Sequence, residues 1–253
     1  MSTIPRFFIP PEKIIGGEFI LEDGQDIKKI RKVLRLESGD KIELNNNQGN
    51  LFLAQIEKLQ KEAVSGIIIE EIELKEVGHN KPYLILAQAL PKGGKMDDII
   101  RMNTEVGVDE FIPFESEFSV VKVKDLRDKK LGKKLIRWSK IAQEAARQSE
   151  RLQIPKINPP VSFESVMGMD ADIKILLHSR DQEGSIDIKE VKTKLTKESV
   201  KDTKILILIG PEGGFSQKEI ELTKGKGFKI VHLDLPILRT ETAGVVVSGI
   251  LLS

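Results

Sequence analysis

Apolar and polar residues follow different patterns in the two parts of the chain. Over residues 1–73, short apolar runs alternate with Gly, Asn and Asp, as in RFFIP, GGEFILEDG and AVSGIIIEEIEL. Short strands separated by such turn residues are typical of a small β-barrel or sandwich. We expect one helix to interrupt these strands at DIKKIRKVLRLE, because Ile27, Ile30, Val33 and Leu34 share one face at helical spacing.

After the polar stretch KEVGHNKP, apolar strands alternate with longer amphipathic segments. This alternation predicts an α/β domain with a mostly parallel sheet, so we expect a second domain over residues 74–253. The charged stretch from residue 187 to residue 204 predicts a surface helix or an insertion. The expected strands are YLILAQAL, EFIPF, IKILLHS, KILILIG and KIVHLDL, and the expected helices begin near Lys95, Lys130, Gln217 and Thr242.

Composition narrows the classes of protein and of site. The 40 Lys and Arg residues nearly balance the 39 Asp and Glu residues, so any surface that binds nucleic acid must be local. Cysteine is absent, and His79, His178 and His232 lie far apart in the sequence, so we expect no metal site. We find no signal peptide and no apolar run of the roughly 20 residues that cross a bilayer, and we expect a cytoplasmic protein.

Basic residues are concentrated in two segments. One is the predicted helix from Lys28 to Arg35, and the other is the segment from Lys122 to Lys156, which holds twelve Lys and Arg against four Asp and Glu. Such clusters are compatible with a solvated helix face or with a surface that contacts phosphates.

The stretch LIGPEGGFSQKEI predicts a buried strand that turns on glycines and enters a helix. Ser216 is placed to cap that helix, with Glu219 three residues later. The turn has neither the GK[ST] of a P-loop nor the G-x-G-x-x-G of a dinucleotide site. The Glu212 carboxylate suits a ligand with hydroxyl or amino groups and a positive charge, such as adenosine joined to a sulfonium. A tight turn without a ligand is the alternative.

A second loop of this kind follows the next predicted strand, in HLDLPILRTETAGVVVSGILLS. Either Thr240 or Thr242 can cap the apolar helix, and Glu241 suits its positive N-terminal end. Arg239 can pair with Glu241 or with Glu212. Because ligands of open α/β sheets bind where strands end, these two loops together predict one site.

The sequence resembles the SPOUT class of RNA methyltransferases, and within it the RsmE-like enzymes. IPRFFI and VLRLESGDKIEL resemble the N-terminal PUA-like domain of these enzymes, and LAQALPKGGKMDDIIRMNTEVGVDEFIPF resembles the start of their catalytic domain. IGPEGGFSQKEI and ILRTETA are their most specific signatures. The resemblance implies S-adenosylmethionine as cofactor and methylation of N3 of a uridine in small-subunit (16S) ribosomal RNA. It also implies a trefoil knot at about residues 205–245 and a homodimer.

Methylation of uridine N3 suggests roles for individual residues. We expect Arg239 to stabilise the developing uracil anion or to orient the base, and Glu212 or Glu241 to hold cofactor hydroxyls or to organise Arg239; no general base is identified. The implied cofactor residues are Leu177, His178, Gly210, Pro211, Glu212, Gly213, Gly214, Leu233, Leu235, Ile237, Leu238, Thr240, Thr242 and Ala243. The RNA-binding candidates are Arg6, Lys28, Arg31, Arg35, Lys95, Arg137, Arg147 and Arg151.

Three residues depart from the family pattern. Asp234 and Pro236 lie where Gly and a basic residue are usual, and Glu150 stands in place of a glycine.

Two other functions stay open on the sequence. One is ribose 2′-O-methylation of RNA, and the other is a noncatalytic RNA-binding role in ribosome assembly. Small residues in the last helix, Gly244 and Ser248 among them, suit a dimer contact or burial within one subunit.

Overall fold

The computed structural model describes residues 4–73, 81–122, 129–179, 184–197, 200 and 202–253. It divides into two compact units, Met1–Val77 with Ser149–Gln153, and Gly78–Gln148 with Ile154–Ser253. The expected boundary after residue 73 adjoins residues 74–80, which lie outside the described residues. The sequence did not indicate that Ser149–Gln153 belongs with the first unit.

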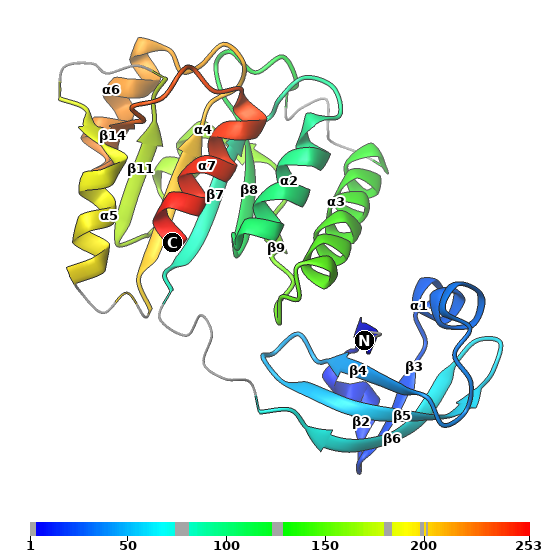
Figure 1. Ribbon diagram of the computed structural model, residues 1–253. Coiled ribbons are helices and arrows are strands. Elements are labelled where there is room, and N and C mark those ends of the chain that lie inside the picture. The colour runs from blue at the N-terminus through cyan, green and yellow to red at the C-terminus, as the bar shows by residue number, and fades with distance from the viewer. Residues whose placement is uncertain (1–3, 74–80, 123–128, 180–183, 198–199, 201) are drawn as a thin grey trace. The chain divides into compact units, whose positions relative to one another are not determined.

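The first unit is a six-stranded sheet with the order β1-β4-β5-β6-β3-β2 (Figure 1). Strand β1 pairs with β4 in parallel, and the other pairs are antiparallel. The expected helix is present as α1 (Gly24–Lys28), which continues as a π-helix, η2 (Lys29–Leu34). A short 3₁₀ turn, η1, spans Pro11–Lys13. The strands are β1 (Arg6–Phe8), β2 (Ile14–Ile15), β3 (Glu18–Leu21), β4 (Lys41–Asn45), β5 (Leu51–Leu59) and β6 (Val64–Glu71).

The apolar face expected for this helix is only half right. Ile27 and Ile30 are buried in the core of the first unit, whereas Val33 is 70% exposed. The winding explains the difference, because π-helical hydrogen bonds join residues five apart and the spacing of three and four residues no longer returns to one face. The π-helix ends at Arg35, whose φ of 53° is left-handed.

The segment Ser149–Gln153 is held to the first unit by hydrogen bonds to its backbone. Arg6 donates to the carbonyl of Glu150 at 2.9 Å, and the fully buried Asn45 donates to the carbonyl of Arg151 at 3.1 Å. Glu150 has a φ of 56°, a conformation that glycine adopts without strain. The glycine expected from the family pattern at this position therefore has a structural reason.

The second unit is an eight-stranded sheet with the order β10-β8-β7-β13-β11-β14-β12, and β9 pairs with β8. Every strand pair described in it is parallel, which confirms the expected α/β class. All five expected strands are present, as β7, β8, β11, β13 and β14. The bounds are β7 (Tyr83–Ala89), β8 (Glu110–Glu115), β9 (Lys156–Ile157), β10 (Val161–Ser162), β11 (Ile173–Leu177), β12 (Ile186–Asp187), β13 (Lys204–Ile209) and β14 (Lys229–His232).

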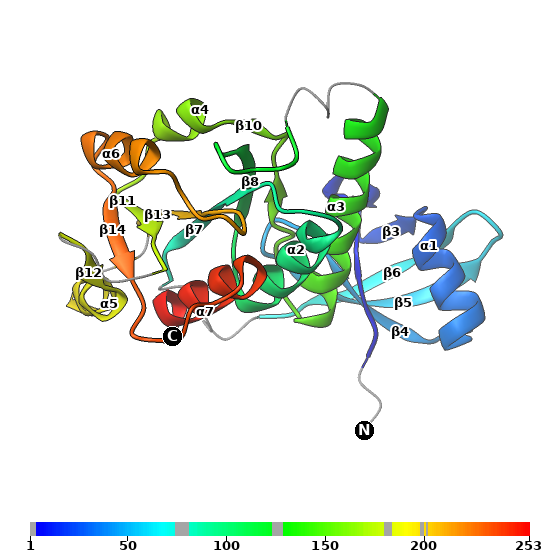
Figure 2. The same cartoon turned by 90° about the horizontal axis from the view of Figure 1, so that it is seen from above.

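Helices cover both faces of this sheet (Figures 1 and 2). On β7, Leu84 and Leu86 pack in one apolar core with α2, α5 and α7, whereas Ile85 and Ala87 pack in the other with α4 and α6. Helices α2 and α6 begin where expected, and α7 begins two residues earlier, at Thr240. The helices are α2 (Lys95–Val106), α3 (Lys129–Gln148), α4 (Phe163–Met167), α5 (Ile188–Lys197), α6 (Gln217–Gly225) and α7 (Thr240–Leu252).

The small residues of α7 let α2 of the same chain approach closely. A Cβ added at Gly244 would lie 3.1 Å from the Asn103 side chain and 3.3 Å from Leu86. The buried Ser248 hydroxyl lies 3.5 Å from Asn103 Oδ1. Packing within one chain therefore accounts for these residues.

Candidate functional site

Three loops at the carboxyl edge of the parallel sheet enclose a cavity of about 490 Å³. They follow β11, β13 and β14, which are adjacent in the sheet. Every residue expected to hold a cofactor lines this cavity except Thr242, which is exposed on α7. The lining also includes Arg239 and five residues that were not expected there: Lys95, Ser179, Ile209, Phe215 and Pro236.

The turn after β13 depends on its glycines. Gly214 has a φ of +71°, and its N–H donates to the carbonyl of Pro211 at 2.9 Å. A Cβ at Gly210 would lie 3.2 Å from the backbone of Gly214, so a side chain there would push the turn apart. The helix that follows begins with the expected capping box of Ser216 and Glu219. The sequence therefore predicted this loop correctly.

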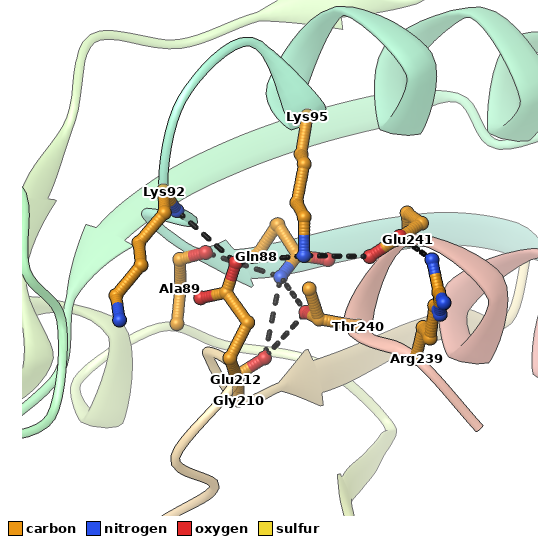
Figure 3. Close-up of polar contacts among 9 residues, drawn as sticks. All are labelled: Gln88, Ala89, Lys92, Lys95, Gly210, Glu212, Arg239, Thr240 and Glu241. Atoms are coloured by element: carbon orange, nitrogen blue, oxygen red, sulfur yellow. Dashed lines mark hydrogen bonds and ion pairs between the residues drawn. The ribbon is translucent and has the colours of Figure 1, made fainter.

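The start of α7 differs from the expectation. Neither Thr240 nor Thr242 caps the helix, because Arg239 occupies the N-cap position without a side-chain cap. The Thr240 hydroxyl instead donates to the carbonyl of Gly210 at 2.6 Å and accepts from the buried Gln88 amide at 2.9 Å (Figure 3). Gln88, near the end of β7, thus joins the loop after β13 to the loop after β14.

Lys95, expected on the RNA surface, lies between two carboxylates at the cavity. Its Nζ is 2.9 Å from Glu212 and 3.4 Å from Glu241 (Figure 3). The N–H of Lys92 also donates to Glu212, at 3.3 Å. Arg239 lies 3.9 Å from Glu241 with its side chain 83% exposed, so the expected Arg239–Glu241 pair exists but is loose. The tighter partner of both carboxylates is Lys95.

These contacts shift two pKa values. The hydrogen bond to Glu212 raises the pKa of Lys95, and the second carboxylate, Glu241, adds to this effect. Burial acts to raise the pKa of Glu212, but the hydrogen bonds from Lys95 and from backbone N–H groups outweigh burial and lower it. Both groups are therefore charged at neutral pH, and the cavity holds two anions and two cations, counting Glu241 and Arg239.

Replacing Glu212 by Gln is expected to lower the melting temperature at neutral pH. Because the folded-state pKa of Glu212 lies below its ordinary value of 4.5, the stabilisation is present above that pH and is lost as the pH falls through the folded-state pKa. Since the pair is partly exposed, we expect a loss of at most about 1 kcal/mol. Thermal melts of both proteins from pH 3 to pH 8 test this, and a difference that persists unchanged at pH 3 would contradict it.

The remaining RNA-binding candidates divide into two groups. Ion pairs hold Arg6 to Glu43, Arg137 to Asp97 and Arg147 to Glu144. Arg6 is mostly buried in the first unit and Arg151 is half-buried, so these two arginines are not the open phosphate contacts that we expected. The exposed candidates are Arg137, which is 68% exposed although it pairs with Asp97, and Lys28, Arg31 and Arg35, which lie along α1 and η2 as far as the C-cap of η2.

Two absences hold for the described residues. No helix among them has the length and apolarity required to span a bilayer. No group of three or more His, Asp or Glu side chains among them is arranged to hold a metal ion.

Comparison with family models identifies both parts of the chain. An RNA methyltransferase domain matches residues 79–252, and an RNA methyltransferase PUA domain matches residues 23–69. The protein named ribosomal RNA small subunit methyltransferase E in Bacillus subtilis is 33% identical over 87% of this chain and 84% of its own length. The protein of that name in Aquifex aeolicus is 32% identical over 94% of this chain and 95% of its own length.

Two solved structures are similar over nearly their whole length. One is a putative methyltransferase from Legionella pneumophila in complex with S-adenosylmethionine, with a TM-score of 0.82, 31% identity, and coverage of 98% of this chain and 97% of that one. The other is ribosomal RNA small subunit methyltransferase E from Neisseria gonorrhoeae bound to S-adenosylmethionine, with a TM-score of 0.78, 25% identity, and coverage of 97% and 95%. The resemblance seen in the sequence is thereby confirmed, and the chain belongs to the RNA methyltransferase family, beside the ribosomal RNA small subunit methyltransferases E.

Proposed function

We propose that this protein transfers a methyl group from S-adenosylmethionine to N3 of a uridine in small-subunit (16S) ribosomal RNA. The observation that carries the proposal is the cavity at the sheet edge, which is lined by the two loops that bear the specific signatures. Relatives named ribosomal RNA small subunit methyltransferase E support it, and one similar structure of that name is bound to S-adenosylmethionine. The similar putative methyltransferase from Legionella pneumophila is also bound to S-adenosylmethionine. The protein would act in the cytoplasm on ribosomal RNA or on the small subunit.

The cavity suits this cofactor. The loop after β14 contributes an apolar wall, Leu233, Leu235 and Leu238, against which adenine can pack. Glu212 offers a carboxylate to hydroxyl or amino groups, and the glycine turn lets a ligand approach the backbone. When bound, S-adenosylmethionine supplies an electrophilic methyl group on a positively charged sulfur.

The chain contributes charge and position. As uracil loses its N3 proton it becomes an anion, and the exposed guanidinium of Arg239 can stabilise that charge at the cavity. Glu241 lies between Lys95, at 3.4 Å, and Arg239, at 3.9 Å, so it holds Arg239 only loosely. Lys95 thus acts through the two carboxylates rather than on RNA. We assign no general base, and solvent can accept the proton.

Mass mapping of ribosomal RNA from a strain that lacks this gene tests the reaction. We expect one uridine to lose a base methyl group and purified protein with S-adenosylmethionine to restore it. A missing ribose methyl group would instead identify a 2′-O-methyltransferase. RNA binding without any restored methylation would identify a noncatalytic assembly factor.

We further propose that the exposed basic side chains of α1, η2 and its C-cap contact phosphates. Replacing Lys28, Arg31 and Arg35 by Gln is expected to weaken RNA binding and to reduce its dependence on log salt concentration by about 0.7 to 0.9 per lost contact. Filter binding at several salt concentrations measures the slope. Replacing Lys189 and Lys194 on α5 by Gln is the matched control, since both are exposed on another element. Equal slopes for the two variants would restore the solvated-face interpretation.

The family resemblance leads us to propose two further features, a homodimer and a trefoil knot at about residues 205–245. The proposed knot spans β13, α6, β14 and the loop that enters α7. It therefore contains two of the three loops that line the cavity, those after β13 and after β14. Sedimentation equilibrium tests the dimer, and a monomer at micromolar concentration would contradict it.

A further inference from the structure

Phe118 is the one large aromatic side chain that is substantially exposed among the described residues. Its exposed fraction is 48%, whereas Trp138 and most of the phenylalanines are buried. Burying an aromatic ring is among the largest single gains available in folding, so a ring held half in solvent suggests a binding role. The reaction proposed above assigns no role to Phe118.

The position of Phe118 links it to the cavity. It lies in the segment after β8, and it touches the glycine turn after β13. A Cβ added at Gly213 would lie 3.1 Å from Phe118 Cβ and 3.6–3.7 Å from its ring. Gly213 itself lines the cavity. The aromatic ring therefore lies beside the part of the cavity wall that Gly213 forms, although Phe118 itself does not line the cavity.

The segment that carries Phe118 is held firmly. Two hydrogen bonds join Ser116 and Ser119. The Ser119 N–H donates to the Ser116 carbonyl at 3.0 Å, and the Ser116 N–H donates to Ser119 Oγ at 3.1 Å. Glu117 N–H donates to the buried carboxylate of Glu219 at 2.9 Å, and Ser216 Oγ donates to the Glu117 carboxylate at 2.7 Å. Because its backbone is fixed, Phe118 can bind a flat ligand without the cost of ordering a mobile loop.

The surroundings favour RNA over a second copy of the chain as the occupant. Lys122 lies in the same segment, 3.3 Å from Glu115, and Arg239 lies at the cavity. The apolar area exposed in the segment consists of Phe118 and Val120, which is far below the roughly 800 Å² per partner of a stable interface. A single exposed aromatic ring suits an unpaired base, since single-stranded RNA is read by stacking bases on aromatic side chains.

We propose that Phe118 is a stacking platform for an unpaired base of the RNA substrate, beside the wall that Gly213 contributes to the cavity. This inference rests on the proposed RNA methylation and adds a substrate contact that neither basic segment provides. Phe118 binds the base through its ring face, and it takes no part in proton or methyl transfer.

Three variants test the proposal. Phe118→Ala is expected to lower kcat/KM for unmethylated small subunits by about 5- to 100-fold, the effect of losing one stacked base. The affinity for S-adenosylhomocysteine, measured by calorimetry, should stay within about twofold. Phe118→Trp should keep most of the activity, and its fluorescence should be quenched when a uridine-containing RNA fragment is added. Val120→Trp is the matched control, because it places the same reporter on an exposed site of the same segment.

The outcomes separate this proposal from the proposed function. If wild type neither binds S-adenosylhomocysteine nor methylates RNA, the function fails. If wild type methylates and Phe118→Ala does so with unchanged kcat/KM, the stacking platform fails. Quenching of Val120→Trp as strong as that of Phe118→Trp also overturns it. A change of oligomeric state in Phe118→Ala would assign the ring to a contact between copies, again against the proposal.

Discussion

Replacing Arg239 by Ala is expected to lower the single-turnover rate of ribosomal RNA methylation by about 10²- to 10³-fold. Its guanidinium is exposed at the cavity and only loosely paired with Glu241, so its charge is available to the substrate. The interaction strengthens only as uracil becomes an anion, and the affinity for S-adenosylhomocysteine should therefore change little. Arg239→Lys should restore part of the rate, because the charge remains but the planar fork is lost.

Arg101→Ala is the matched control for this experiment. Arg101 is an exposed arginine on α2 that also pairs with carboxylates, Asp98 and Glu105, and it does not line the cavity. Its loss should leave the methylation rate unchanged. A normal rate in Arg239→Ala would remove the catalytic role. A joint fall in melting temperature and cofactor affinity would show that Arg239 is a structural partner of Glu241.

Replacing Gly213 by Val is expected to weaken the binding of S-adenosylhomocysteine by at least about tenfold. The new Cβ would lie 3.1 Å from Phe118 Cβ. Phe118 Cβ cannot easily move away, because the neighbouring backbone N–H of Glu117 is hydrogen-bonded to Glu219. Overpacking of this kind costs about 1–3 kcal/mol, and here the turn is the part that must move. Calorimetry with S-adenosylhomocysteine measures the loss, and circular dichroism checks the fold.

Gly225→Val provides the control, since nothing lies within 4 Å of a Cβ at that position in α6. Its cofactor affinity should match that of wild type. Undiminished binding in Gly213→Val would show that the turn after β13 is not part of the cofactor site. Gly213→Ala, which adds only the Cβ, should fall between the two.

The features that the sequence predicted correctly are those that depend on local pattern. The five strands of the parallel sheet are apolar runs bounded by turn residues, and the turn from Gly210 to Gly214 combines a left-handed glycine with a capping box. Each of these signals lies within a few neighbouring residues. The expectation of an α/β domain followed from them directly.

The features that the sequence missed depend on residues that are distant in the chain. Lys95 and Glu212 pair across 117 positions, and Gln88 reaches Thr240 across 152. No spacing rule connects such residues, so Lys95 was assigned to RNA merely because it is basic. The π-helical winding of η2 was missed for another reason. The apolar residues from Ile27 to Leu34 are spaced as in an ordinary α-helix, so their pattern does not show that the hydrogen bonds join residues five apart.

The assignment of Ser149–Gln153 to the first unit makes the two units interleaved along the chain. The polypeptide passes from one unit to the other at three places, after Val77, after Gln148 and after Gln153. A fragment that ends at Val77 would lack the carbonyl of Arg151, and the Asn45 amide would lose a hydrogen bond worth about 0.5–1.5 kcal/mol. The first unit is therefore not a detachable module, and an insertion or circular permutation that preserves it must carry both of its segments.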